Sequence, residues 1–430
     1  MKRNVLISVY DKTGLDKLSE YLINNNHVIY STGGTLKHIR DLKLETANNE
    51  NLIDISNYTE SPEICNGRVK TLHPKIFGGI LALRDNDSHS NDLTKINAVT
   101  FDTIIVNLYP FAETLKKTKR EEEIIEQIDI GGHSLIRAGV KNYKNISVLT
   151  SPDQYDSYIS LMKSFNNNHH NNRLIESNHK YAKNAIKCIM NYDMDINNWF
   201  NGSDNIGISY DKCNDMKYGL NPYMKPSSVY MKNGRLPPYE ILNGKPGYIN
   251  LLDANNAIKL VLESKEALGR DCCTSFKHTS PAGVSILLNT NNDSGSSGKT
   301  FKSSQEELFY NTRHIDPLSS FGDLIGFSGM VDVHMATRLS KYVSDGIIAY
   351  DYTNEALEIL KTKKKGNYLI MKQQSIVDEI EYRDVNGVTL SQPVNTIICE
   401  RFTIDSNESI NTIINNNFIL GFITLKHTQS

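Results

Sequence analysis

Asn4-Val5-Leu6-Ile7-Ser8-Val9-Tyr10-Asp11-Lys12-Thr13-Gly14 is the stretch that decides the fold of the first half of the chain. It begins with a short apolar run, typical of a buried strand, and continues as a polar loop that ends in glycine. Three leucines follow at helical spacing between residues 15 and 22. The stretch therefore predicts a strand, a loop and a helix in that order, which is the repeating unit of α/β proteins.

A second unit of the same kind runs from Val28 to about Asp41, and its loop is Ser31-Thr32-Gly33-Gly34-Thr35. Glycines and hydroxyl groups between a strand end and a helix start suit a phosphate, because they allow close backbone approach to free amides at the positive end of the helix dipole. Taken alone, such a loop is more often only a tight turn, since it matches neither the dinucleotide fingerprint nor the Walker pattern.

Composition narrows the range of functions. The chain has 430 residues, which favours two domains because one hydrophobic core rarely serves so many. Its 47 basic and 49 acidic residues give a formal charge of −2, so no global charge favours nucleic acid or an anionic membrane as partner. The 6 cysteines are scattered, which indicates reduced thiols and no metal site. No apolar run approaches the roughly 20 residues of a membrane span, so we expect a cytoplasmic protein.

Gly67-Arg68-Val69-Lys70-Thr71-Leu72-His73-Pro74 places two cations two residues apart. In an extended chain Arg68 and Lys70 lie on one face, so both could converge on an anion. The plain alternative is an exposed basic edge strand.

The next strand is predicted over 103–106 and leads into Asn107-Leu108-Tyr109-Pro110-Phe111. Tyr109 then lies at a strand's carboxyl end, where open α/β sheets hold their ligands. A further glycine loop, Gln127-Ile128-Asp129-Ile130-Gly131-Gly132, precedes a helix. Asp129 is a candidate proton carrier, and the alternative is a carboxylate that only caps this helix.

These five motifs, in this order, resemble the N-terminal domain of the bifunctional AICAR transformylase/IMP cyclohydrolase family of purine biosynthesis. The resemblance implies a methylglyoxal-synthase-like, doubly wound parallel α/β sheet over residues 1–200. It also implies an enzyme domain that closes formyl-AICAR to IMP with loss of water and without a cofactor. Tyr10 stands where relatives can have a serine, so we leave it out of the predicted site.

The resemblance assigns a role to each matching position. Lys70 and Tyr109 would stabilise the oxyanion at the formyl carbon, while Asp129 and Lys141 would move protons at the carboxamide nitrogen. The residues expected to bind the substrate and its phosphate are Ser8, Lys12, Thr32, Gly33, Gly34, Thr35, Arg68 and Thr71.

In the second half, Ser275-Phe276-Lys277-His278-Thr279-Ser280-Pro281-Ala282-Gly283 sets an amine beside an imidazole. The two side chains can serve one ligand only if the backbone bends, and we expect Ser280, Pro281 and Gly283 to supply that bend. For a bare dipeptide, a solvated lysine and a structural histidine are the commoner outcome.

The second half resembles the transformylase part of the same family. Between Trp199 and Met216 the chain turns to Asn, Gly, Ser and Asp, so we predict a linker over 201–215. The resemblance implies, over 216–430, the N-terminal part of a cytidine-deaminase-like α/β transformylase domain without its zinc. Lys277 and His278 would be the catalytic pair that moves a formyl group from 10-formyltetrahydrofolate to AICAR. The residues expected to shape the nucleotide pocket are Lys217, Tyr218, Asn250, Phe321, Gly322 and Asp345.

Departures from the family pattern lower the expectation for formyl transfer. Lys217 stands where relatives usually have arginine, and His427 where they have tyrosine. The family motif continues past Ser430, so we expect an incomplete domain with impaired formyl transfer. The resemblance further implies a homodimer with small-molecule substrates: formyl-AICAR and IMP, AICAR, and folate.

A function of another class remains open at this stage. The glycine loops could bind a phosphorylated nucleotide in a non-catalytic or regulatory module.

Two other motifs lead to no predicted site. Gly295-Ser296-Ser297-Gly298-Lys299-Thr300 lacks the first glycine of a Walker loop. His169-His170 lies in an Asn-rich stretch typical of a solvated loop.

Overall fold

The computed structural model describes residues 2–44, 51–164, 171–287, 300–374, 380–399, 402 and 412–428. It divides into two compact units, Met1–Ser209 and Tyr210–Ser430. The Walker-like motif at 295–300 and His169-His170 lie outside the described residues, save Thr300. Among the described helices, none combines the length and apolarity that crossing a bilayer requires.

The first unit contains a five-stranded sheet in the order β3-β2-β1-β4-β5, and every neighbouring pair is parallel. Its strands are β1 Asn4–Ser8, β2 Val28–Ser31, β3 Leu52–Asp54, β4 Thr103–Val106 and β5 Ser147–Leu149. The strands predicted from the apolar runs at the N-terminus, at 28–30 and at 103–106 are confirmed.

Both faces of this sheet are covered. Val5 and Ile7 of β1 belong to one apolar core, and Leu6 between them belongs to the other. Side chains alternate across a strand, so two cores on alternate residues require helices on both sides. The first core packs against α1 Leu15–Asn24, α2 Gly33–Asp41 and α9 Tyr155–Ser164; the second packs against α3 Ile55–Thr59, α4 Pro74–Leu81, α8 Gly131–Lys141 and α10 Asn171–Asn201. The doubly wound prediction is confirmed.

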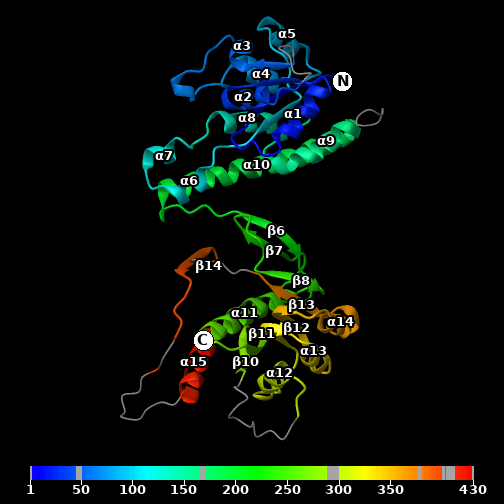
Figure 1. Cartoon of the computed structure of the whole chain (residues 1–430), viewed down its shortest axis with the longest axis vertical. Coiled ribbons are helices and arrows are strands. Elements are labelled where there is room, and N and C mark those ends of the chain that lie inside the picture. Colours follow the sequence, from blue (N-terminus) through cyan, green and yellow to red (C-terminus); the bar gives the residue numbers. More distant parts are fainter. Residues whose placement is uncertain are drawn as a thin grey trace. The chain divides into compact units, whose positions relative to one another are not determined.

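The remaining helices of this unit are α5 Asp87–Lys95, α6 Phe111–Lys117, α7 Glu121–Ile125 and the short 3-10 turns η1 Cys65–Gly67 and η2 Pro152–Gln154. Helix α10 runs past α8 toward α6, which it also contacts (Figure 1).

The second unit is built on a six-stranded mixed sheet in the order β10-β9-β11-β12-β13-β8. The strands are β8 Tyr239–Asn243, β9 Cys272–Lys277, β10 Ser280–Ile286, β11 Asp323–Val331, β12 Ser344–Tyr352 and β13 Leu369–Gln373. One face packs on α11 Tyr248–Leu268 and α15 Thr412–Lys426. The other packs on α12 Ser304–His314, α13 Val333–Ser340 and α14 Asn354–Thr362, which the turn η3 Lys363–Gly366 follows.

Two hairpins stand apart from this sheet: β6 Tyr210–Asp215 with β7 Ser228–Lys232, and β14 Ile380–Val385 with β15 Val388–Pro393. The division between the units falls inside the predicted linker, but residues 210–215 form β6 and not linker. Residues 210–215 are polar because most of their side chains face solvent in this strand. That polar composition is why a loop was predicted there.

Candidate functional site

The strand order of the first sheet reverses between β1 and β4. The chain proceeds from β1 outward through β2 to β3, and then from β4 outward to β5. Loops at the carboxyl ends of β1 and β4 diverge at such a switch point and leave a crevice for a ligand. A pocket of about 610 Å³ lies there. It is lined by the predicted residues Ser8, Lys12, Thr32, Gly34, Thr35, Arg68, Lys70, Thr71, Tyr109 and Asp129.

Asn107 ties the two diverging loops together. Its Oδ1 accepts the backbone N–H groups of Tyr10 at 2.6 Å and Asp11 at 3.0 Å, and its Nδ2 donates to the Asp11 carbonyl at 2.8 Å. The Asn107 side chain therefore holds the loop after β1 against the end of β4. Asn107 and Tyr10 both line the pocket, and neither was predicted as a site residue.

The predicted phosphate loop forms the start of α2. The Thr35 hydroxyl donates to the Val9 carbonyl at 3.0 Å and accepts the Val9 N–H at 3.2 Å, so it joins β1 to α2. What this loop offers an anion is thus its backbone amides and the helix dipole. Gly33 does not line the pocket but borders it: a Cβ at Gly33 would lie 3.5 Å from Lys70 Nζ.

Carboxylates hold both cations of the 67–74 segment. Lys70 Nζ lies 3.2 Å from Glu63 Oε2, and Arg68 forms an ion pair with Glu126. Glu126 also lines the pocket. An anionic ligand must therefore compete with these carboxylates for the cations. Sequence patterns missed Glu63 and Glu126, because both look like ordinary surface residues.

Asp129 presents a half-buried carboxylate to the pocket. Burial raises its pKa above the ordinary value of 3.8, although the backbone N–H groups of Gly132, Tyr109 and His133 oppose that rise. The Gly132 N–H donates to Asp129 Oδ1 at 2.7 Å in the first turn of α8. Asp129 therefore both binds the first turn of α8 and lines the pocket. A Cβ at position 132 would lie 2.7 Å from Asp129 Oδ2, so a larger residue there would displace the carboxylate.

Lys141 is not among the residues that line this pocket. It is the last residue of α8, whose first residues Gly131 and Gly132 do line it. A helix rises about 1.5 Å per residue, so the two ends of α8 lie roughly 15 Å apart. The structure therefore separates Lys141 from the other predicted catalytic groups.

In the second unit the Lys277-His278 pair lies at a tight hairpin. Lys277 is the last residue of β9, and Ser280 is the first of β10. The turn is made by His278 and Thr279, with φ of 53° and 67°. The expectation that Ser280, Pro281 and Gly283 bend the chain is wrong, because these residues lie within β10 and pair with β9.

Such a turn suits Asn-Gly better than His-Thr, so it needs outside support. The buried carboxylate of Asp253, on α11, accepts the Thr279 N–H at 2.7 Å. Asp253 was missed by the sequence patterns, where it reads as one polar residue on a long helix.

The start of α11 gathers other predicted residues. Asn250 Oδ1 accepts the Gly247 N–H at 3.0 Å and so caps the helix. A Cβ at Gly247 would lie 3.4 Å from both Asn250 and the Tyr218 ring. Lys217 Nζ stands over that ring at 5.5 Å from its centre.

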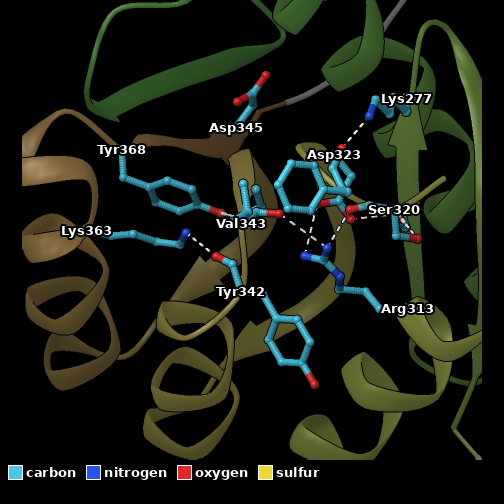
Figure 2. A network of polar contacts seen from close by, with 12 residues as sticks. Lys277, Arg313, Ser320, Asp323, Tyr342, Val343, Asp345, Lys363 and Tyr368 are labelled. Atoms are coloured by element: carbon cyan, nitrogen blue, oxygen red, sulfur yellow. Dashed lines mark hydrogen bonds and ion pairs between the residues drawn. The ribbon is translucent and has the colours of Figure 1, made fainter. Parts of the chain in front are cut away.

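A polar network connects Lys277 to the loop that carries Phe321 and Gly322 (Figure 2). Lys277 Nζ donates to the Phe321 carbonyl, and the Gly322 N–H donates to the Val343 carbonyl at 3.0 Å. Beneath this loop Arg313 and Asp323 form a buried ion pair of 3.0 Å, and Ser275 donates to Asp323 at 2.6 Å.

The predicted residue Asp345 and the departure His427 both pair with other side chains. Asp345 pairs with Lys364 at 2.7 Å, in the same neighbourhood as the network (Figure 2). His427 pairs with Glu263 of α11 at 2.8 Å, and Glu263 also pairs with Lys426. His427, which stands where relatives have tyrosine, thus links the end of α15 to α11.

Within the described ranges, no three His, Cys, Asp or Glu side chains gather as a metal site requires. The fold and the first pocket define a doubly wound α/β protein that offers cations, backbone amides and a half-buried carboxylate at its switch point. That donor set suits a small phosphorylated ligand.

Comparison with known protein families matches both parts of the chain to family models. Residues 14–134 match the MGS-like domain, and residues 139–430 match the AICARFT/IMPCHase bienzyme family. The chain belongs to the AICARFT/IMPCHase bienzyme family of purine biosynthesis, whose members carry AICAR formyltransferase and IMP cyclohydrolase activities. The resemblance stated from the sequence is confirmed.

Two curated relatives agree with this assignment. The bifunctional purine biosynthesis protein PurH of Clostridium botulinum (strain Loch Maree / Type A3) is 34% identical over 436 residues, covering 100% of this chain and 81% of the relative. PurH of Thermoanaerobacter sp. (strain X514) is 36% identical, covering 92% of this chain and 74% of the relative. The crystal structure of ForH aligns with 46% of this chain and 100% of its own at 24% identity and a TM-score of 0.39.

Proposed function

We propose that the first unit closes formyl-AICAR to IMP in the pocket between β1 and β4. The observation that carries this proposal is the pocket itself, where the segments after β3 and β4 bring Lys70, Tyr109 and Asp129 to the start of α2, which suits an anion. Ring closure is intramolecular, so the site needs to fold the substrate, hold its phosphate and move protons.

The proposed steps balance in atoms and charge. The carboxamide nitrogen attacks the formyl carbon, a C–N bond forms, and the formyl oxygen becomes an oxyanion. Lys70 and Tyr109 stabilise that oxyanion by donating hydrogen bonds, and Asp129 accepts a proton from the nitrogen. Asp129 returns its proton to the oxygen, the formamido nitrogen gives up a second proton as the C–O bond breaks, and water leaves with a C=N bond formed in the ring. The phosphate lies at the amides of α2.

For the second unit we infer formyl transfer from 10-formyltetrahydrofolate to AICAR at the β9–β10 turn. The residues present fit the chemistry of that donor: the Lys277 ammonium makes one backbone hydrogen bond and keeps further N–H groups for a formyl oxygen. The exposed His278 imidazole is placed to accept a proton from the aromatic amine. Folate dependence, impairment of this step, the cytidine-deaminase-like arrangement and a homodimer stay predictions.

The direct test supplies each substrate to the purified chain. Formation of IMP from formyl-AICAR supports the cyclohydrolase assignment, while tight IMP binding without turnover would favour a non-catalytic nucleotide-binding module. Formylation of AICAR in the presence of 10-formyltetrahydrofolate tests the second unit.

His278→Ala should lower the rate of AICAR formylation. The control is His334→Ala, on α13 at the other face of the sheet, which should leave that rate unchanged. Equal rates in the two variants would contradict the role given to His278.

The pH dependence of ring closure should reveal Asp129. Since the carboxylate is the active form and burial raises its pKa, kcat/KM should fall as the pH drops through a value above the ordinary 3.8. The measurement is the acid limb of the pH profile, compared with that of Asp129→Asn. The limb should disappear in the variant; an acid limb that persists unchanged would assign the titration to another group.

A further inference from the structure

Tyr192 of α10 holds the peptide groups on both sides of Ile128. Its hydroxyl donates to the Gln127 carbonyl and accepts the Asp129 N–H at 2.8 Å. The Tyr192 side chain is almost fully buried, with 8% of its surface exposed. The Tyr192 hydroxyl thus hydrogen-bonds to two backbone groups of the segment that carries Asp129. Both Gln127 and Asp129 line the pocket.

The next residue of α10 contacts the first turn of α8. Asp193 Oδ1 lies 3.0 Å from His133 Nε2. His133 directly follows Gly132, whose N–H donates to Asp129 Oδ1 at 2.7 Å. Tyr192 therefore fixes the main chain at Asp129, and Asp193 fixes the turn of α8 that binds its side chain.

Tyr192 also contacts the segment that carries Tyr109. The Phe111 ring meets Tyr192 edge-to-face, with 6.1 Å between ring centres, and the Phe111 N–H donates to the Tyr109 carbonyl at 2.9 Å. The Tyr109 backbone N–H is near enough to the Asp129 carboxylate to lower its pKa. A single aromatic side chain thus packs on one proposed catalytic segment and hydrogen-bonds to the other.

We propose that Tyr192 and Asp193 are positioning residues for ring closure, which hold Asp129 and Tyr109 in register with each other. The inference rests on the roles proposed above for those two residues. Catalytic groups must be held within a fraction of an ångström, and a shift of about 1 Å can cost roughly 10²-fold in rate. Neither positioning residue lines the pocket, so neither is expected to touch substrate.

Tyr192→Phe removes the hydroxyl and keeps the ring. We expect kcat for ring closure to fall about tenfold with KM for formyl-AICAR within about twofold of the wild type. The matched control is Tyr181→Phe on the same helix. Tyr181 is equally buried, at 7% exposed, but its hydroxyl bonds Ser157 on the opposite face of the sheet. The control should leave kcat unchanged.

A double-variant cycle with Asp129→Asn separates positioning from a general structural effect. When Asp129 is already Asn, Tyr192→Phe should lower the residual rate by less than about twofold. An equal fold-loss in both backgrounds, or a wild-type kcat in folded Tyr192→Phe, would overturn the inference while leaving the proposed function standing. A wild-type rate in Asp129→Asn alone would instead overturn the proposed function.

If Tyr192→Phe does not fold, Asp193→Asn carries the test. Its side chain is 56% exposed, so folding should survive the change. The expected result is a loss of about two- to fivefold in kcat that vanishes in the Asp129→Asn background. An unchanged kcat in Asp193→Asn would then overturn the inference.

Discussion

Lys70→Ala should lower kcat for the closure of formyl-AICAR by about 10²- to 10³-fold, the loss usual when one donor to a developing oxyanion is removed. Lys70 lines the pocket and forms an ion pair with Glu63, which a bound substrate would have to replace. Stability should change little, by less than about 1 kcal/mol, because about a third of each side chain in this ion pair is exposed. Steady-state kinetics and urea unfolding of the same preparation test both parts.

The control for Lys70→Ala is Lys17→Ala, in the same unit. Lys17 also pairs with a carboxylate, Asp156 at 2.7 Å, but lies on α1 away from the pocket. Its loss should leave kcat unchanged. Equal rates in Lys70→Ala and Lys17→Ala would show that the first pocket does not use Lys70 in the reaction.

Arg313→Met should destabilise the second unit by about 3–5 kcal/mol, the range expected when one partner of a buried ion pair is removed. Arg313 and Asp323 are 5% and 0% exposed, and the substitution keeps volume while leaving the Asp323 carboxylate unpaired. The guanidinium also donates to the Ser320 and Val343 carbonyls (Figure 2). The loop with Phe321 and Gly322 should therefore loosen as well.

The loss in Arg313→Met should depend on pH, and the sign follows from Asp323. Burial raises the pKa of Asp323 to about 6 even beside Arg313, and removing the cation should raise it further. Between the unfolded and folded pKa values the folded state binds more protons, so its stability falls as pH rises. Urea unfolding at about pH 5 and about pH 8 should show the larger destabilisation at the higher pH.

Lys361→Ala provides the surface comparison for Arg313→Met. Lys361 pairs with Glu358 at 2.8 Å on α14, where most of the Glu358 side chain is exposed, so the expected cost is below about 1 kcal/mol. A similarly small and pH-independent cost in Arg313→Met would contradict the view that the buried pair supports the Phe321 loop.

Much of the first site was predictable because its information is local. Apolar runs predicted the strands, and glycine or hydroxyl residues marked the loops after them. The carboxyl ends of parallel strands share one edge of the sheet, so residues as distant as Ser8, Thr32 and Tyr109 were expected to meet. The pocket brings them together.

The supports of the site were not predictable in the same way. Glu63 has no periodic or motif signal, and Tyr192 looks like any apolar-facing tyrosine of a long helix. Lys141 shows a different limit: the resemblance grouped it with Asp129, while α8 begins two residues after Asp129 and ends at Lys141. Distance along a rigid helix is a property of the folded chain.

The sequence by itself determined the α/β units, the glycine loops, the family and the residue types available for ring closure, since each depends on neighbours along the chain. Only the tertiary structure decided which carboxylates pair with Lys70 and Arg68, that His278 and Thr279 make their own turn on Asp253, and that Tyr192 holds Asp129. Those contacts join segments far apart in sequence. They exist only because the packing of helices on the sheets brings their atoms within hydrogen-bonding distance.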